Sequence, residues 1–175
     1  MTDLRYPIGK FKMEGDLTDA QRQKFIGDIA EAPAKLRAAV ARLSAQQIDT
    51  PYRPEGWTVR QVVHHLPDSH LNGYIRFKLA LTEEQPTIKP YDQERWAQLD
   101  DARTAPIEIS LALLESLHQR FTLLLRSLGL RDFDRTLRHP EMGVLSLARY
   151  LGLYSWHGRH HVAHITALRD RMGWA

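Results

Sequence analysis

Hydrophobic residues recur at spacings of three and four along four long stretches of the chain. That period is typical of amphipathic helices, and we find no convincing alternating series that would indicate strands. The first two stretches begin with the spacing of a capping box, at Thr18–Gln21 and Thr58–Gln61. Gly129 ends the third and Ser146 caps the fourth. The pattern therefore predicts an all-α chain, with helices over about residues 18–43, 58–81, 107–128 and 147–172.

The stretches between the predicted helices are rich in proline, glycine and polar residues. Residues 1–17 are expected to form an irregular arm over the body. Residues 83–106 form a long connection with a short helix near 92–98, and residues 130–145 form a second connection with a helical turn near 131–134. Four amphipathic helices with two long connections predict a four-helix bundle, in a single domain that spans residues 1–175.

Two prolines fall inside predicted helices. Pro33 either kinks the first helix or starts a new one. Pro67 removes a backbone hydrogen bond from the second helix, at a cost of about 3 kcal/mol. We expect a kink at Pro67, or a helix that neighbouring groups support.

The composition narrows the possible functions. The chain has 175 residues, of which 43% are hydrophobic and 26% charged, and its net charge of +3 is spread along its length. Nucleic-acid binding is therefore poorly supported. The absence of cysteine excludes disulfides, a cysteine nucleophile and iron–sulfur clusters. No apolar run reaches membrane-spanning length and the N-terminus lacks an apolar signal core, so we expect a cytoplasmic protein without a membrane partner.

The last predicted helix carries the most distinctive chemistry. Four of the nine histidines fall within eight residues and form two pairs spaced by four, His157/His161 and His160/His164. An ideal helix places His161 on the apolar face and His157 at its rim, and turns His160 and His164 toward solvent. Gly158 lies in the middle of the inward face, where a missing side chain leaves room. The inward pair is the better candidate for a metal site.

Two imidazoles one helical turn apart can bind one ion, as in the H-E-x-x-H motif. No glutamate follows His157, so a zincin protease is not indicated. Without cysteine, the ligands must be histidine, carboxylate or water, which suits Zn, Ni, Co, Mn or Fe. A metal bound at this pair is expected to be a divalent ion, Zn²⁺ or Ni²⁺. The alternative is a pair of hydrogen-bonded core histidines.

A second histidine cluster lies on the predicted helix 58–81, at His64, His65 and His70. Counted from Val59 on an ideal helix, His70 lies on the apolar face and His65 lies off it. Periodicity alone therefore selects His70 as the residue that faces the core.

Several segments together have the form of a known family: 6–9, 56–66, 68–70, 74–78, 153–157, 163–166 and 171–174. They include Gly56-Trp57-Thr58-Val59-Arg60-Gln61-Val62-Val63-His64-His65-Leu66 and Leu153-Tyr154-Ser155-Trp156-His157. The chain resembles the YfiT branch of the DinB-like metalloproteins over essentially its whole length. The resemblance implies a DinB-type four-helix bundle, a homodimer, and one divalent metal held by three histidines.

The resemblance matches the metal ligands to His65, His157 and His161, and so disagrees with periodicity over the first ligand. His70 is then a group beside a ligand, a contact for the substrate, or a hydrogen-bonded core residue. Asp68 either orients a ligand imidazole or is solvated. Arg159 and His160 are further candidates for contacts to the site or substrate. Arg60, Arg76 and Arg159 are expected at the surface, although any of them near the metal could bind an anionic group.

Three histidines leave a coordination position open, as in catalytic metal sites. The resemblance implies a metal-dependent hydrolase of a small molecule, in which the metal activates water or another nucleophile. Members of the wider family are thiol S-transferases, so conjugation of a low-molecular-weight thiol such as bacillithiol to an electrophile is the alternative. A non-catalytic bundle that the metal stabilises and that binds a partner is a third hypothesis.

Overall fold

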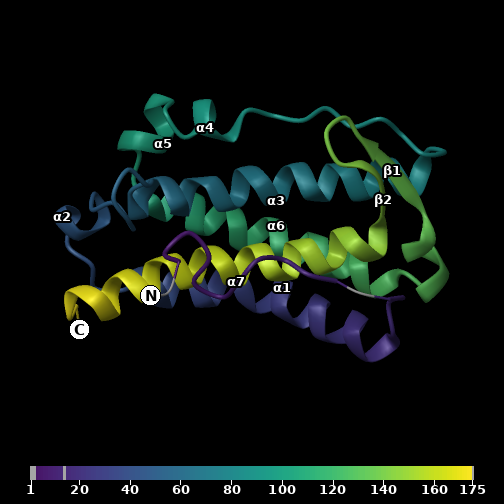
Figure 1. Cartoon of the computed structure of the whole chain (residues 1–175), viewed down its shortest axis with the longest axis horizontal. Coiled ribbons are helices and arrows are strands. Elements are labelled where there is room, and N and C mark those ends of the chain that lie inside the picture. Colours follow the sequence, from purple (N-terminus) through teal and green to yellow (C-terminus); the bar gives the residue numbers. More distant parts are fainter. Residues whose placement is uncertain (1–2, 14, 175) are drawn as a thin grey trace.

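The computed structural model describes residues 3–13 and 15–174. Four long helices form a bundle: α1 (Asp19–Val40), α3 (Val59–Thr82), α6 (Ile107–Ser127) and α7 (Leu147–Met172) (Figure 1). This confirms the four-helix bundle predicted from the sequence. The shorter elements are α2 (Ala45–Ile48), α4 (Gln93–Trp96), α5 (Asp100–Thr104), the 3₁₀ helix η1 (Leu130–Asp134) and strands β1 (Thr136–His139) and β2 (Gly143–Ser146).

The long helices begin where their capping residues predicted. Thr18 accepts from the backbone N–H of Gln21, Thr58 accepts from that of Gln61, and each glutamine reaches back to the capping residue. Each box satisfies donors that the first turn leaves free. Ser146 caps α7 by accepting from the Arg149 N–H at 3.2 Å.

The long connections follow from the directions of the helices. α1 and α7 run side by side in one direction, and α3 and α6 run side by side in the other (Figure 1). Consecutive α3 and α6 are thus parallel neighbours, so residues 83–106 must return along the whole bundle. Gln61 of α3 donates to the Ala97 carbonyl at 2.7 Å and Arg60 to that of Ala105 at 2.8 Å, which hold this connection against α3.

Neither proline ends a helix. α1 continues through Pro33 and α3 continues through Pro67, and both rings are buried. The prediction that Pro33 could start a new helix was wrong. Burial against the other helices outweighs the lost backbone bond at each site.

The second connection contains a hairpin that the sequence did not predict. β1 pairs antiparallel with β2 over Thr136↔Ser146 to His139↔Gly143. Each strand has only four residues, too few for a recognisable alternation of apolar and polar positions. The strands are also stabilised from outside, because the Ile88 N–H donates to the Arg138 carbonyl at 3.0 Å. The expectation of a chain without strands was therefore wrong at this end of the bundle.

Two apolar clusters fill the two ends of the bundle. One, near the hairpin, includes Ile29, Phe77, Phe121 and Tyr154; the other, near the C-terminus, includes Leu36, Leu66, Leu114 and Ile165. The intervening layer carries His65, His70, His118, His157 and His161. The core is thus interrupted by histidines supplied from α3, α6 and α7.

The predicted arm lies along α7 (Figure 1). The indole N–H of Trp156 donates to the Gly9 carbonyl at 3.1 Å, and His164 Nε2 lies 3.1 Å from the Arg5 carbonyl. The arm therefore covers the histidine-bearing half of α7. Along the described ranges, no helix is long and apolar enough to cross a membrane.

Candidate metal centre

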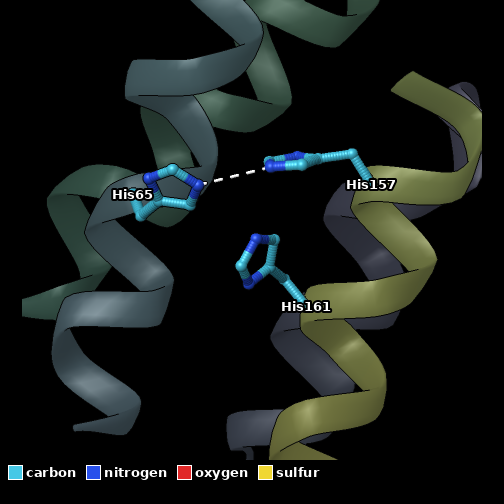
Figure 2. Close-up of side chains that lie close together, drawn as sticks. All are labelled: His65, His157 and His161. Atoms are coloured by element: carbon cyan, nitrogen blue, oxygen red, sulfur yellow. Dashed lines mark hydrogen bonds between the residues drawn. The ribbon is translucent and has the colours of Figure 1, made fainter. Parts of the chain in front are cut away.

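Three histidines face one another across the space between α3 and α7. His65 projects from α3, and His157 and His161 project from α7 one turn apart (Figure 2). Each offers a ring nitrogen, and these three atoms all lie within 4.8 Å of one another. The structure thus brings together the three residues that the resemblance matched to metal ligands.

The spacing of these nitrogens suits one small cation. His65 Nε2 and His157 Nε2 are 3.3 Å apart. Two nitrogen ligands at about 2.0–2.1 Å from one tetrahedral ion lie roughly 3.3 Å from each other. The pair is therefore already at the separation that a shared metal requires. His65 and His161 are buried and His157 is half-buried, so a bound ion would keep a route to solvent.

A chain of histidines holds the ring of His157. His118 Nδ1 lies 2.6 Å from the Ile29 carbonyl, which can only accept, so this nitrogen carries the proton. His118 Nε2 then accepts from His70 Nδ1 at 2.9 Å, and His70 Nε2 accepts from His157 Nδ1 at 3.1 Å. One backbone carbonyl thereby sets the tautomer of every neutral ring in the chain. The last ring, His157, presents an unprotonated Nε2 toward His65.

A second, shorter chain holds His161. His164 Nε2 lies 3.1 Å from the Arg5 carbonyl and therefore donates to it. His164 Nδ1 is then an acceptor, and it faces His161 Nδ1 at 3.4 Å. The proton of His161 is placed on Nδ1, which leaves Nε2 for a metal. Both α7 histidines thus have the tautomer that a metal ligand needs, and the site fits a divalent cation.

Burial keeps these rings neutral. Desolvation lowers the pKa of His65 to about 3, with smaller contributions from His160 and His164. Desolvation likewise places the pKa values of His70, His157 and His161 well below the ordinary value of histidine. Neutral imidazoles are the form that coordinates a metal.

Two predictions about α7 were wrong. His160 and His164 are buried rather than turned toward solvent. The Trp156 ring stacks on His160 at 4.2 Å between centroids, and Tyr52 stacks on His164 at 4.0 Å. The helical phase was sound, but the arm and the loop before α3 cover what would be the outer face of an isolated bundle.

The other predictions for α7 agree with its surroundings. His161 is buried, and His157, expected at the rim, is half-buried. A Cβ added at Gly158 would meet the Ala32 methyl at 3.2 Å and His70 Cε1 at 3.8 Å. The missing side chain lets α1 approach α7 closely beside the histidine chain.

The remaining candidates differ in their distance from the three histidines. His70 touches the His157 ring directly, so it belongs to the site. Arg159 pairs with Asp28 at 3.4 Å and lines neither of the cavities described next. Desolvation and the charge of Asp101 raise the pKa of Asp68 to about 6. In the described part of the chain, no hydrogen bond joins the Asp68 carboxylate to a histidine.

Two cavities meet at His157 and Gln93. The smaller, of about 330 Å³, contains His65 and His161 and is walled by Tyr52 and Trp57. The larger, of about 600 Å³, extends toward the hairpin. The ring of His157 therefore borders both spaces: a substrate in the smaller cavity lies against all three histidines, and one in the larger cavity lies against His157.

Sequence reasoning missed two residues near the site. His118 was not among the candidate site residues predicted from the sequence, yet it anchors the His157 chain and is 2% exposed. Arg76 was expected at the surface, yet it is buried and lines the larger cavity. His118 falls on the apolar stripe of α6, one residue after Leu117, which was an available signal. Arg76 donates to the Lys89 carbonyl of the long connection, a contact that no local pattern reveals.

The profile of the DinB superfamily matches residues 28–165. The chain belongs to the DinB superfamily. This confirms the resemblance recognised in the sequence.

Individual relatives of this DinB protein match it over nearly the full length. A protein of Bacillus cereus (strain 03BB102), named "Putative metal-dependent hydrolase", is 55% identical over 174 residues, which cover 99% of this chain and 100% of the relative. A protein of the same name from Bacillus anthracis (strain A0248) is equally similar, with the same coverage of both chains.

A solved structure is similar to this one in both sequence and fold. It is that of YfiT from Bacillus subtilis, described as "a probable metal-dependent hydrolase with an unusual four-helix bundle topology". It is 52% identical, covers 99% of this chain and 100% of its own, and superimposes with a TM-score of 0.97.

Proposed function

We propose that this DinB protein is a metal-dependent hydrolase of a small molecule, with one divalent metal, Zn²⁺ or Ni²⁺, held by His65, His157 and His161. The observation that carries this proposal is the two hydrogen-bonded chains that leave Nε2 of both α7 histidines free beside His65. The names of the relatives support the same reaction class. These three histidines would hold the metal, which would supply Lewis-acid polarisation of the substrate and activation of a nucleophile.

The protein's own residues supply positioning and exclusion of water. Trp57 packs on the His65 ring at 4.7 Å between centroids, and its indole N–H donates to Glu94 at 3.0 Å. This contact packs one side of the His65 ring against the Trp57 indole. The cavities on the two sides of His157 give a substrate room to extend along α7.

A thiol S-transferase is the second candidate, and one observation favours it. The carboxylates that line the two cavities in the described ranges, Glu55, Glu94, Asp92 and Glu141, are all exposed. Hydrolysis gains from a buried carboxylate as general base, whereas a thiol whose pKa a metal has lowered needs none. The chain has no cysteine, so it cannot supply the thiol itself. The thiol in this proposal is a low-molecular-weight compound that enters the site.

The test uses the metal-loaded protein and two panels of substrates. One contains esters, amides and related bonds, and the other combines small thiols with an alkylating electrophile. Turnover in the first panel that is lost in His157→Ala supports the hydrolase. Conjugation in the second that is lost in the same variant supports the transferase instead.

The matched control is His64→Ala. His64 is a buried histidine of α3, next in the chain to His65. Its ring contacts Ser110 and the Ala105 carbonyl, away from the three histidines. Its loss should leave either activity in place. If neither panel reacts and metal removal unfolds the protein, the metal-stabilised binding module replaces both enzymes. The homodimer and the cytoplasmic location stay predictions.

A further inference from the structure

The larger cavity has a composition unlike that of the metal centre. It lies between α3, α7, residues 90–93 of the connection and the turn of the hairpin. Tyr91, Tyr150, Leu153 and Tyr154 give it apolar and aromatic walls, and His157 forms its end at the metal centre. One strongly charged side chain, Arg76 of α3, lines it from within.

Arg76 is buried and lacks a counter-charge. The residue is 8% exposed, and its guanidinium donates to the Lys89 carbonyl at 3.0 Å and to the Tyr150 hydroxyl at 3.4 Å. Both acceptors are neutral. Across residues 3–13 and 15–174, no carboxylate forms an ion pair with it. A buried charge is costly unless an opposite charge compensates it.

The guanidinium of Arg76 also has N–H donors that the described bonds do not use. It carries five N–H donors in a planar fork, and the two described bonds occupy two of them. Such a fork recognises carboxylate and phosphate groups through paired hydrogen bonds. The side chain is therefore equipped for an anion that the described residues do not provide.

Two more donors line the same cavity. His139 Nδ1 accepts from the backbone N–H groups of Glu141 at 3.2 Å and Met142 at 3.3 Å, so its proton lies on Nε2. Burial keeps this ring neutral by lowering its pKa, and the charge of Arg76 adds to the effect. Tyr150 accepts from Arg76 and keeps its own O–H to donate. The interior of the cavity thus presents three kinds of donor.

The acidic residues of the cavity do not neutralise Arg76. Asp92 and Glu141 are both exposed at its outer side. Asp92 is already engaged, because it caps α4 and pairs with Arg95 at 3.4 Å. The buried part of the cavity therefore carries positive charge, and its rim carries negative charge.

The distance to the metal centre sets the size of a ligand. His157 lies seven residues after Tyr150 on α7, which is roughly 10 Å along the helix at about 1.5 Å per residue. Seven residues are close to two turns, so both side chains lie on the same face. A molecule anchored at Arg76 would reach His157 with a part that is about 10 Å from its anionic group.

We propose that Arg76, with His139 and Tyr150, binds the anionic group, a carboxylate or a phosphate, of an elongated small substrate whose reacting bond lies at the metal centre. This inference rests on the proposed function for the role of the metal centre but not for the binding of the anion. The aromatic walls suit an apolar or aromatic body between the two ends of the substrate.

The test compares small ligands that share a phenyl ring and differ in the charge of the group attached to it. The probes are 3-phenylpropionate, its neutral amide, 3-phenylpropylamine and phenyl phosphate, titrated by ligand-observed NMR into metal-free and metal-loaded protein. We expect 3-phenylpropionate to bind about tenfold or more tightly than the amide, because the carboxylate compensates the charge of Arg76 and offers it two equivalent acceptor oxygens, whereas the amide is neutral. The ratio of phenyl phosphate to 3-phenylpropionate affinity shows which anion the site prefers.

Variants assign the preference to Arg76. Arg76→Gln should bring the ratio between acid and amide close to one, and Arg76→Lys should keep part of it. Arg135→Gln is the matched control, because Arg135 also holds backbone carbonyls, those of Ala80 and Glu83, but does not line this cavity. If Arg76→Gln fails to fold by circular dichroism, Arg76→Lys and the wild-type charge series still decide the question.

The outcomes separate this proposal from the proposed function. Equal binding of acid and amide, or an unchanged ratio in Arg76→Gln, would overturn the anion site. So would acid binding that requires the metal and survives Arg76→Gln, since the metal itself would then hold the acid. An anion preference in the metal-free protein, lost with Arg76, supports the site even where both substrate panels stay unreacted.

Discussion

The two α7 histidines that we propose as metal ligands, His157 and His161, are held by histidine chains that differ in where they end. The chain from His157 passes through His70 and His118 to the Ile29 carbonyl and lies inside the bundle, among α1, α3 and α6. The chain from His161 passes through His164 to the Arg5 carbonyl, which belongs to the irregular arm. One ligand is thus oriented by the core itself and the other by a segment laid over the core.

This difference predicts that a broken bond has a larger effect in one chain than in the other. A broken bond in the buried chain leaves a donor and an acceptor without water to replace the lost partner. A broken bond at the arm exposes His164 to solvent, which can take the place of the Arg5 carbonyl. The buried chain should therefore matter more for metal affinity and for stability, although both chains set a tautomer in the same way.

The largest effect should come from the ligands, where the two chains are equivalent. His157→Ala and His161→Ala each remove a nitrogen from the site. We expect each to weaken Zn²⁺ binding by more than about 100-fold, beyond the effect typical of an outer partner. Competition with a chromogenic chelator measures the affinity, and circular dichroism verifies the helices. Wild-type affinity in either variant would remove that residue from the ligand set.

The next effect is that of breaking the buried chain. His118→Phe keeps an aromatic ring but leaves the Ile29 carbonyl and His70 Nδ1–H without partners. We expect Zn²⁺ affinity to fall about 10–100-fold and the free energy of unfolding to fall by about 1–3 kcal/mol. Urea unfolding and metal competition measure the two quantities.

The control for His118→Phe is Thr122→Val. Thr122 is one turn further along α6 and equally buried, but its hydroxyl donates to the His118 carbonyl of its own helix. The control should leave the metal affinity unchanged. An equal loss in both variants would mean that packing of α6, rather than the tautomer of His157, controls the site.

A smaller effect should follow from removing the arm. A chain that begins at Lys10 loses the Arg5 carbonyl and the Gly9 contact of Trp156. We expect Zn²⁺ affinity to fall by about tenfold or less, since water can replace the carbonyl. His164→Phe in the full chain should change the affinity by a similar amount. If removal of the arm costs more than His118→Phe, the ranking of the two chains is reversed.

Acid should lower the stability of the metal-free protein, because the buried histidines of the chains are neutral in the folded state. Desolvation lowers the pKa of His118 to about 4, from a reference value of 6.5. Above pH 6.5 His118 is neutral in both the folded and the unfolded protein. Below that pH it binds its proton first in the unfolded protein. The metal-free protein should therefore lose stability as the pH falls from 6.5 to about 4, by about 3 kcal/mol from this residue alone.

Asp68 has the opposite effect on stability as the pH falls. Its raised pKa, about 6, means that the folded state takes up its proton first and gains stability as the pH falls toward 3.8. One carboxyl opposes several buried histidines, so the net change on acidification should be a loss. Urea titrations at pH 7 and pH 4.5 measure it, and His118→Phe should show a shallower loss than the wild type. An equal slope in both proteins would contradict a buried, neutral His118.

The sequence by itself determined the bundle and the α7 pair. Periodic apolar residues and two capping boxes act within a few residues of one another, so the long helices could be placed from local pattern. The spacing of His157 and His161 put both side chains on one side of one helix. The choice of His65 over His70 came from the resemblance, because an ideal helix pointed to His70.

Only the tertiary structure decided what lies around those histidines. His160 and His164 are buried by the arm and a loop, His118 of α6 meets His70 of α3, and Arg76 donates to the Lys89 carbonyl of the long connection. Each of these contacts joins residues that are far apart in the chain or lie in segments without periodicity. A helical pattern records which side of a helix faces inward, but not which segment covers the other side.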